Sequence, residues 1–552
     1  MNKNSIAQKD NSNNQSAINL IIAIFVFLTV AATIFMGKGF LVPQPAVEVG
    51  QISQQDIYAP FEFSFIDIDG KEINVKKDEI IVERGQKINK TQHLANTELK
   101  KNKKQPKNLY YILGILLLMI IFCVITVTYQ TIRKLKVLTE LKNVVLLCLV
   151  SLLLILGAKA IILSGWSVYL IPIASVSMLV AILVDPGVSL MATVILSIFI
   201  GVLTGVRLDV MVAMLAGGIV SIYSVINVRR RRDLTKAGIL IGLTNMISIV
   251  AMGMINFISI NYIIKQGAWG LASGIISGVI VTAFLPVFEV LFGITTNVSL
   301  LELSDLNQPV LKELVLKAPG TYHHSLVVGN LAESAAEAVG ANTLLARVGG
   351  YFHDIGKLRM APYFTENQAH SEDKHENLSP TISSLIIINH VKEGSDLAKK
   401  YKLGSAINDI IVQHHGDDIV QFFYHRALEQ NGQEKNSVQA EDFRYPGPKP
   451  QSKEAAIVML ADAVEAASRA MPAPTPVKIK AIVNRLINNK FIDGQLDGCD
   501  LTLKDLHTIS NVFIHILNGI FHTRIEYPDI KQFTNEQNKH KESSEKNKNK
   551  QP

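Results

Sequence analysis

His353-Asp354-Ile355-Gly356-Lys357 lies within a histidine-rich region, since thirteen of the chain's fourteen histidines follow residue 322. Imidazole and carboxylate groups together bind Mn, Fe or Zn ions, and Asp354, next to His353, is placed to bridge two of them. The candidate ligands recur at wide separations, which suits helices that project side chains into the centre of a bundle. These candidates are His324, His353, Asp354, His390, His414, His415 and Asp462. The pattern predicts a metal-dependent hydrolase.

Helical periodicity extends to both sides of this stretch. Apolar residues recur at three- and four-residue spacing from Leu326 to Ala338, which predicts an amphipathic helix beginning near Gly320. A second apolar helix leads up to His353. Few strand signals follow Tyr322, so the C-terminal third is expected to be all-α. Further helices are predicted over residues 379–390, 406–415, 453–470 and 476–488, and a polar connector over residues 295–319.

The rest of the chain is too apolar for a wholly soluble protein. Of its 552 residues, 48% are hydrophobic. Eight segments of about 20 residues are long and apolar enough to cross a bilayer as helices. They are residues 18–36, 109–129, 143–163, 167–184, 187–206, 210–227, 237–257 and 268–292. The leader, residues 1–17, is polar, and no small-residue cleavage site ends the first segment, so a retained anchor in the bilayer is expected rather than a signal peptide.

Basic loops predict the orientation of these segments. Lysines and arginines gather between the second and third segments and again after the sixth, at Arg229–Arg232, and the positive-inside rule places both loops in the cytoplasm. Both termini are then cytoplasmic. Residues 37–108 become a short extracellular module with strand-like pieces such as residues 62–66. The basic run at 100–104 disagrees, but it lies in a polar loop that can be translocated despite its charge.

Composition argues against several functional classes. The three cysteines, Cys123, Cys148 and Cys499, form neither a disulfide framework nor a cysteine zinc site. The net charge of +7 comes largely from loops and a Lys-rich tail, residues 531–552, that is expected to be disordered. No nucleic-acid-binding motif accompanies this charge, so no nucleic acid polymer is expected as a partner. The spans contain few ionisable residues, which argues against a transporter.

The doublet and the later histidines resemble the HD-domain phosphohydrolase superfamily, and the surrounding sequence narrows the resemblance. Five segments are similar to the membrane-bound 7TM-HD family that hydrolyses cyclic di-AMP. They are APGTYHHS (318–325), ENQ (366–368), HHG (414–416), RYPGPKP (444–450) and MLADAVEA (459–466). The family's parts also follow in the same order: an anchor helix, an external region, seven spans over residues 109–292 and a cytoplasmic all-α HD domain over residues 293–530. The external module is much shorter than is typical of the family, so its ligand is unknown.

The resemblance implies two divalent ions, Mn or Fe, that activate water and stabilise charge on phosphoryl oxygens. It also implies hydrolysis of cyclic di-AMP to linear 5′-pApA. The catalytic residues would be His353, Asp354 and Lys357, and the residues facing the substrate would be Lys357, Arg444 and Tyr445. The implied ligands are His324, His353, Asp354 and Asp462 for one ion, and Asp354, His390, His414 and His415 for the other.

Several points stay open at this level. Neighbouring helical residues point about 100° apart, so His323 is expected either to support a ligand from behind or to lie at the surface, and His415 need not join His414 as a ligand. A cyclic di-GMP phosphodiesterase of the HD-GYP type lacks support, because no Gly-Tyr-Pro signature follows His415. A membrane receptor that binds a nucleotide without cleaving it has no need for seven metal ligands. A homodimer is possible, and no general acid for the leaving group is identifiable.

Overall fold

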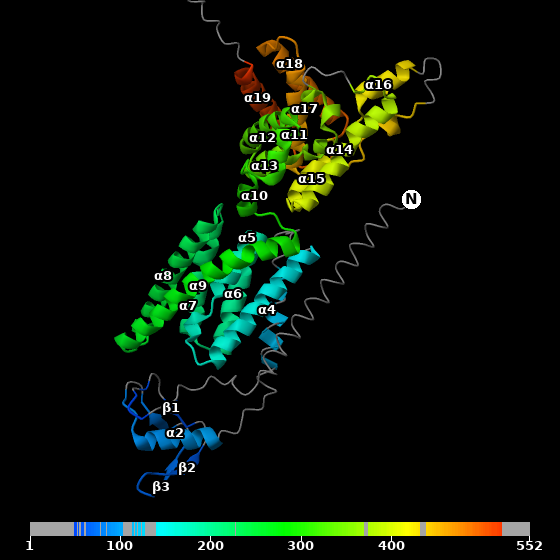
Figure 1. Ribbon diagram of the computed structural model, residues 1–552. Helices are drawn as coiled ribbons and strands as arrows, with labels where there is room; N and C mark the ends of the chain where they lie inside the picture. Colours follow the sequence, from blue (N-terminus) through cyan, green and yellow to red (C-terminus); the bar gives the residue numbers. More distant parts are fainter. Residues whose placement is uncertain are drawn as a thin grey trace, which may run out of the picture. The chain divides into compact units, whose positions relative to one another are not determined.

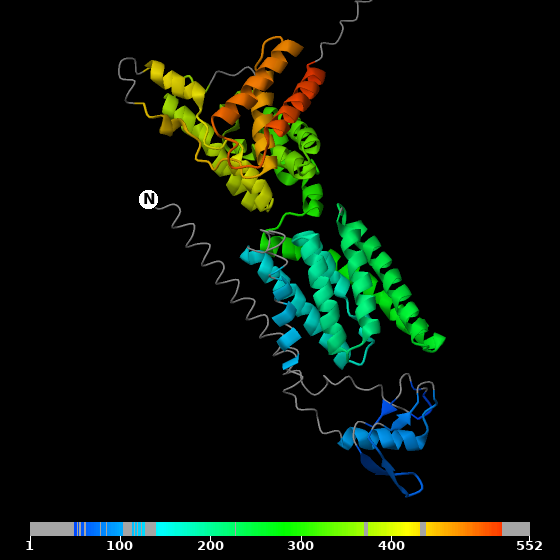
Figure 2. The same cartoon turned by 180° about the vertical axis from the view of Figure 1, so that it is seen from behind.

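The structure is a computed structural model that describes residues 49–128 with gaps and residues 140–521 except residue 227 and segments 369–373 and 431–437. The chain divides into two compact units, Met1–Glu302 and Leu303–Pro552. Figure 1 and Figure 2 show both units from opposite sides. The first contains a small α/β module and a helical bundle, and the second is built of helices.

The α/β module consists of two short antiparallel sheets and one helix. β2 alternates buried phenylalanines with exposed residues, because successive side chains of a strand point to opposite faces. Phe63 and Phe65 pack with Val75 and Leu99 in a small core. The strand predicted near residues 62–66 is thus confirmed. The paired strands are β1 (Ile57–Tyr58) with β4 (Ile80–Val82) and β2 (Phe63–Ile66) with β3 (Glu72–Val75), and the helix is α2 (Lys90–Asn102).

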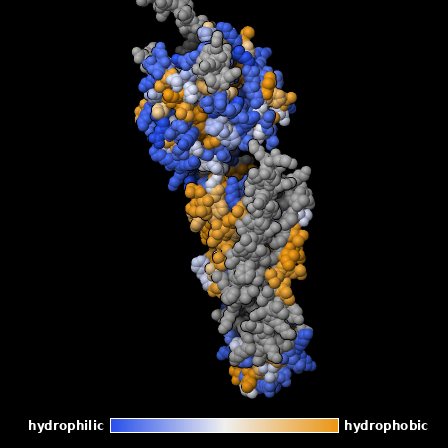
Figure 3. Space-filling model, turned by 90° about the vertical axis from the view of Figure 1, so that its right-hand side faces the viewer, coloured by the Kyte–Doolittle hydropathy of each residue, from blue (hydrophilic) through white to orange (hydrophobic). Residues whose placement is uncertain are grey.

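Five helices in the described part of the chain are long and apolar enough to cross a membrane. They are α4 (Leu141–Leu163), α6 (Pro186–Leu203), α7 (Leu208–Val225), α8 (Arg231–Ile255) and α9 (Ile260–Phe292). Five of the eight predicted segments therefore form long apolar helices, which confirms a membrane bundle. Figure 3 shows hydrophobic side chains gathered on the exposed surface of this bundle.

The predicted count of eight spans is not confirmed. The segment predicted at 167–184 is broken into the 3-10 helix η3 (Val168–Leu170) and α5 (Ile173–Leu183). With 11 residues, α5 is shorter than the about 20 residues that cross a bilayer as a helix. Of the remaining two segments, 18–36 lies outside the described residues and 109–129 is described only in part.

Glycines allow α8 and α9 to approach closely. A Cβ added at Gly274 would lie 2.1 Å from the backbone nitrogen of Gly242, and one added at Gly278 would lie 3.0 Å from the carbonyl oxygen of Leu234. Small residues at such interfaces let helix backbones approach within a bilayer, where the hydrophobic effect does not drive helices together. The two helices therefore pack through their backbones.

The second unit is a compact helical domain around α17. Residues Ala455–Ala461 of α17 are all buried. Its elements, with α10 preceding them across the boundary of the two units, are α10 (Asn297–Leu303), α11 (Pro309–Lys317), α12 (Pro319–Ala338), α13 (Thr343–Phe352), η4 (Ile355–Tyr363), η5 (Thr365–Asn367), α14 (Pro380–Lys400), α15 (Ser405–Gln413), α16 (Gln421–Gln430), η7 (Ala440–Phe443), α17 (Lys453–Arg469), α18 (Pro476–Ile492) and α19 (Leu503–Ile520).

The sequence-based helix boundaries need two corrections in this domain. The polar connector expected over residues 295–319 contains α10 and α11, and Val310, Leu311 and Leu314 form the buried stripe through which α11 packs. The helix predicted over 379–390 continues to Lys400, since Leu397 and Ala398 are also buried. Helices α16 and α19 were not predicted.

Side-chain caps define where several of these helices begin. The hydroxyl of Ser379 accepts a hydrogen bond from the backbone N–H of Ile382 at the start of α14, and Ser452 does the same for α17. Such caps satisfy backbone donors that the first turn leaves unpaired. They fix the start, and with it the register, of the two helices that carry His390 and Asp462.

Candidate metal centre

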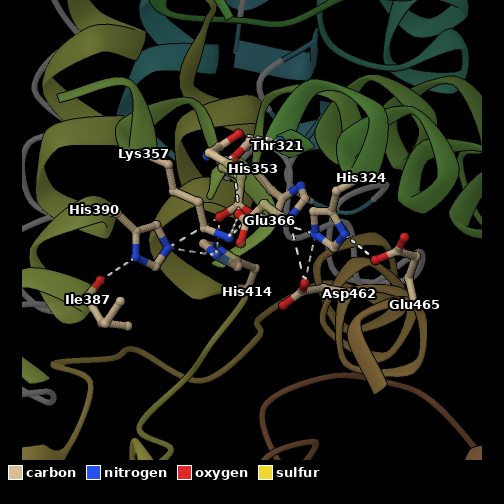
Figure 4. Close-up of polar contacts among 12 residues, drawn as sticks. Thr321, His324, His353, Lys357, Glu366, Ile387, His390, His414, Asp462 and Glu465 are labelled. Atoms are coloured by element: carbon tan, nitrogen blue, oxygen red, sulfur yellow. Dashed lines mark hydrogen bonds and ion pairs between the residues drawn. The ribbon is translucent and has the colours of Figure 1, made fainter. Parts of the chain in front are cut away.

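All seven predicted ligands meet in one buried cluster, although they come from three helices, α12, α14 and α17, and from the segments that directly follow α13 and α15. The structure arranges them as two groups that share Asp354, and within each group one ligand atom per residue lies within 4.8 Å of the others. The groups are His324, His353, Asp354 and Asp462, and Asp354, His390, His414 and His415. Figure 4 shows His324, His353 and Asp462 converging, with His390 and His414 beside them.

The two members of each histidine pair differ in how deeply they are buried. His324 is buried in the cluster, whereas His323 is exposed, as the helical geometry predicts. His415 belongs to the second group and is half-buried, while His414 is fully buried. Both imidazoles reach the centre from the C-terminal end of α15, which runs to Gln413, and their ring centroids lie 4.1 Å apart.

Backbone carbonyls orient three of the imidazoles. Nδ1 of His353 donates to the carbonyl oxygen of Gly350 at 2.8 Å, and Nδ1 of His414 donates to that of Ile411 at 2.7 Å. Nδ1 of His390 likewise donates to a carbonyl, that of Ile387. A carbonyl oxygen only accepts, so each Nδ1 carries a proton, and in the neutral imidazole each Nε2 keeps its lone pair for the centre. Metal-binding histidines are commonly oriented in this way.

His324 is oriented by a side chain that the sequence analysis missed. Its Nδ1 bonds to the buried carboxylate of Glu465, which also accepts from Nε of Arg469 at 3.0 Å. Glu465 follows Asp462 by three residues on α17, so both carboxylates lie on the same helix face. That i, i+3 spacing from a predicted ligand is the sequence signal that could have identified it.

Buried polar atoms in the cluster lack partners. Nε2 of His324, Nε2 of His353 and Oδ1 of Asp354 are buried without a hydrogen bond among the described residues. His324 Nε2 lies 3.0 Å from Asp462 Oδ1, and His390 Nε2 lies 3.4 Å from Asp354 Oδ1. Lone pairs that face one another in a buried site are unfavourable unless a cation lies between them. The residues therefore fit two divalent cations with Asp354 as the shared ligand.

The charges around the cluster act on its histidines in opposite directions. Burial lowers the pKa of His390 to about 4, and the charges of His414 and Lys357 add to this against the opposing effect of Asp354. Burial also disfavours charge on His353, but the carboxylates of Asp354 and Asp462 outweigh it and raise its pKa to about 10. His390 is therefore neutral at pH 7, which is the form that binds a metal.

Lys357 is fixed between two carboxylates. Its Nζ lies 2.7 Å from Asp354 Oδ2 and 2.9 Å from Glu366 Oε1. Although burial opposes it, these negative charges raise the pKa of Lys357, so the ammonium stays charged. The hydroxyl of Thr321 donates to Glu366 at 3.0 Å. Lys357 thus brings a positive charge to the edge of the cluster.

Gly356 explains why the HD stretch approaches α14 so closely. A Cβ at this position would lie 1.8 Å from the carbonyl oxygen of His390. Because no side chain intervenes, η4 packs directly on α14, and Asp354 is brought to His390. The glycine is therefore part of the way in which the two groups come together.

Tyr445 and Arg444, both predicted to face the substrate, have different surroundings. The ring of Tyr445 stacks on His415, with ring centroids 4.2 Å apart and an angle of 22° between the planes. The Arg444 guanidinium donates to the carbonyl oxygen of Asp417 at 2.6 Å and pairs with Glu441. Tyr445 thus contacts the cluster, whereas Arg444 holds the loop that carries Tyr445.

A cavity of about 250 Å³ opens beside the first group of ligands. It is lined by His324, Lys357, Thr365, Glu366, Asp462, Glu465, Ala466, Arg469 and Ala470. Neither Arg444 nor Tyr445 is among the lining residues. The walls of this cavity are formed by α12, η4, η5 and α17.

A helical domain that brings a His-Asp doublet, four further histidines and a distant aspartate into one cluster has the architecture of an HD domain. Residues 321–467 match the HD domain family model, and residues 109–296 match the model described as a 7TM receptor with intracellular HD hydrolase. The chain belongs to this family of membrane proteins with an HD domain.

Similar proteins include two enzymes named cyclic-di-AMP phosphodiesterase PgpH. The one from Bacillus subtilis (strain 168) is 37% identical over 83% of this chain and 66% of its own length. The one from Listeria monocytogenes serotype 1/2a is 41% identical over 57% of this chain and 44% of its own length. The chain thus spans less than two thirds of the length of either relative. A crystal structure of the L. monocytogenes PgpH HD domain in complex with cyclic di-AMP is 46% identical, covering 40% of this chain and all of that one, with a TM-score of 0.37.

Proposed function

We propose that this protein is a membrane-bound phosphodiesterase that hydrolyses cyclic di-AMP to linear 5′-pApA. The proposal rests on the pair of ligand groups that share Asp354. Two divalent ions about 3.5–4 Å apart are common catalysts of phosphodiester hydrolysis. The relatives from Bacillus subtilis and Listeria monocytogenes, both named cyclic-di-AMP phosphodiesterases, support the choice of substrate.

The residues of the cluster would bind two ions. His324, His353, Asp354 and Asp462 would hold one ion, and Asp354, His390, His414 and His415 the other. Manganese and iron suit a set made of imidazoles and carboxylates. When bound, the two ions polarise the phosphoryl group and activate water.

Several side chains would act on the substrate itself. Lys357 would pair with a phosphoryl oxygen as a compact positive charge, because its ammonium is held at the edge of the cluster by Asp354 and Glu366. Tyr445, stacked on His415, would limit how the substrate approaches the second group. Arg444 would hold the loop that carries Tyr445. It would also contact the substrate at the rim of the site.

We also propose the topology that the sequence predicts. An anchor helix over 18–36 and seven spans over 109–292 would place the leader, the HD domain over 293–530 and the tail over 531–552 in the cytoplasm of a bacterial cell. Residues 37–108 would lie outside and could bind an external ligand. The basic residues at Arg229–Arg232 before the body of α8, together with the family match over 109–296, support this arrangement. A homodimer would be compatible with it.

The substrate is tested with the full-length protein in lipid nanodiscs. We expect that, with Mn, it converts cyclic di-AMP to 5′-pApA and acts poorly on cyclic di-GMP, with products separated by chromatography. Turnover of the guanine dinucleotide alone would identify an HD-GYP-like activity instead. Tight binding of cyclic di-AMP without turnover, in protein loaded with metal, would identify a receptor.

Adjacent histidines offer a matched control for the site. We expect His324→Ala to abolish turnover and His323→Ala to leave it unchanged, because only His324 is buried in the cluster. Equal activity of the two variants would place the reaction elsewhere in the protein.

A further inference from the structure

We propose that Arg469 binds the second phosphodiester of the substrate, the one that is not being cleaved. The inference rests on the proposed function, since a cyclic dinucleotide carries two phosphates and only one can lie at the ions. It gives the cavity beside the centre a role in substrate recognition, with one phosphate at the ions and the other at Arg469.

The cavity has the size and position for part of a dinucleotide. Its volume of about 250 Å³ is below the roughly 300–1,000 Å³ of pockets that enclose a drug-sized ligand. Its lining includes His324 and Asp462 of the centre and, further along α17, Arg469 and Ala470. A substrate with one phosphate at the ions would therefore extend along α17 and meet Arg469 within the cavity.

The position of Arg469 on α17 separates it from the ions. Arg469 follows Asp462 by seven residues, which is two helical turns on the same face and about 10 Å along the axis. Ala466 and Ala470 line the cavity on either side of it with small side chains, which leave room for a ligand. The guanidinium bonds to Glu465, which in turn bonds to Nδ1 of His324, so a carboxylate and an imidazole separate it from the ions while it remains close enough to reach another part of the same ligand.

Two cationic side chains line the cavity, and they differ in exposure and in the number of N–H donors that remain for a ligand. Lys357 is only 14% exposed and is held by Asp354 and Glu366. The Arg469 side chain is 37% exposed, and its bonds to Glu465 use Nε and Nη2. A guanidinium has five N–H donors in a planar fork, so Nη1 still has donors for a phosphate.

Glu465 makes Arg469 a directed group and not a free surface arginine. The Glu465 side chain is 7% exposed and bonds to both Nδ1 of His324 and the guanidinium of Arg469. In Figure 4, Glu465 lies on the far side of His324 from Lys357. The carboxylate therefore sets the orientation of an ion ligand and of the phosphate-binding arginine together.

The test compares two ligands that differ in the second phosphate. Full-length wild-type protein and the Arg469→Gln and Arg469→Lys variants are assayed in nanodiscs for kcat and KM with cyclic di-AMP. The inhibition constant of adenylyl-(3′→5′)-adenosine, which has two adenines and a single phosphodiester, is measured in the same assay. Metal content is determined for each protein. Arg359→Gln serves as control, because Arg359 also pairs with a glutamate, Glu393, but does not line the cavity.

We expect Arg469→Gln to raise KM for cyclic di-AMP by roughly 10- to 100-fold, as for the loss of a charged hydrogen bond. Its kcat, its metal content and the inhibition constant of the single phosphodiester should stay close to those of the wild type. Arg469→Lys should recover part of the loss, and Arg359→Gln should behave like the wild type.

Three results would overturn the assignment. An unchanged KM would show that Arg469 does not contact the substrate. An equal loss of affinity for both ligands would place the contact on a base or on the first phosphate. A fall in metal content would show that Arg469 acts only by holding Glu465 and His324. Failure of the proposed function gives a different result, in which the metal-loaded wild type cleaves bis(p-nitrophenyl) phosphate but not cyclic di-AMP.

Discussion

Polar side chains are buried in the membrane bundle and in the HD domain, but their hydrogen bonding differs. In the bundle, Ser189 donates to the carbonyl oxygen of Ser177, and Thr193 donates to that of Ser189. In the HD domain, Nε2 of His353 and Oδ1 of Asp354 are buried without a hydrogen bond to any residue that the structure describes. These two hydroxyls are satisfied by the helices themselves, and so they serve packing. The unpaired atoms of the HD domain converge, and so they are left available for ions.

A substitution at Asp354 should have the largest effect on the unpaired cluster of the HD domain, because Asp354 belongs to both groups of ligands. We expect Asp354→Ala to lose both ions and to lower turnover by more than about 100-fold. This loss exceeds the one expected for residues that only hydrogen-bond to a metal ligand. Metal per chain, measured by mass spectrometry, and cyclic di-AMP turnover test this. Asp396→Ala, at an exposed position on α14, is the control. An Asp354→Ala protein that still bound one ion tightly would exclude a shared ligand.

A smaller effect is expected at His415, the half-buried member of the second group. His415→Ala should remove one ion of the two and lower turnover by about 10- to 100-fold, while the first group keeps its ligands. Tyr445→Phe keeps the aromatic ring that stacks on His415, so it should retain both ions. Two ions per chain in His415→Ala would mean that three ligands suffice for the second position.

The same substitution in the two regions separates packing from chemistry. Gly356→Ala and Gly274→Ala should each lower stability by about 1–3 kcal/mol, because the added methyl group meets backbone atoms in both cases. Only Gly356→Ala should also lower turnover, since it pushes η4 away from α14. Thermal unfolding and activity are measured together. Gly519→Ala and Gly157→Ala, where nothing lies within 4 Å of the added Cβ, are the matched controls. Lost activity in Gly274→Ala would show that bundle packing controls the site.

The smallest effect is expected from an exposed ion pair of the first unit. Arg231 Nε lies 2.7 Å from Glu302 Oε1, and about half of each side chain is in contact with solvent. Arg231→Gln should change stability by less than about 1 kcal/mol and leave turnover unchanged. A double-mutant cycle with Glu302→Gln measures the pair directly. A coupling well above this value would give the pair a structural role.

The metal centre was predictable because its ligands are recognised by residue type. His390 and Asp462 lie 72 residues apart, yet both belong to the few residue types that bind Mn or Fe. Glu465 escaped notice because a glutamate on an amphipathic helix is usually solvated, and only the fold places its carboxylate against Nδ1 of His324. The 3-10 helix η4 had no sequence signal, because its course depends on contact with α14 at Gly356.

The helices were less evenly predictable than the ligands. α13 and α17 follow a strong apolar periodicity and lie where it placed them. α11 has only three buried residues, so its pattern is too short to stand out from a polar loop. The break between η3 and α5 does have a sequence signal in Pro172, but this proline stands in an apolar run long enough to be counted as a single span.

The carbonyl groups that orient His353, His390 and His414 make this part of the site robust to mutation. Every residue type has a backbone carbonyl, so replacing Ile387 or Ile411 changes a side chain without removing the acceptor. His324 has no such protection, because its acceptor is the side chain of Glu465. Random mutagenesis should therefore tolerate conservative apolar replacements at Ile387 and Ile411 far more often than any replacement at Glu465.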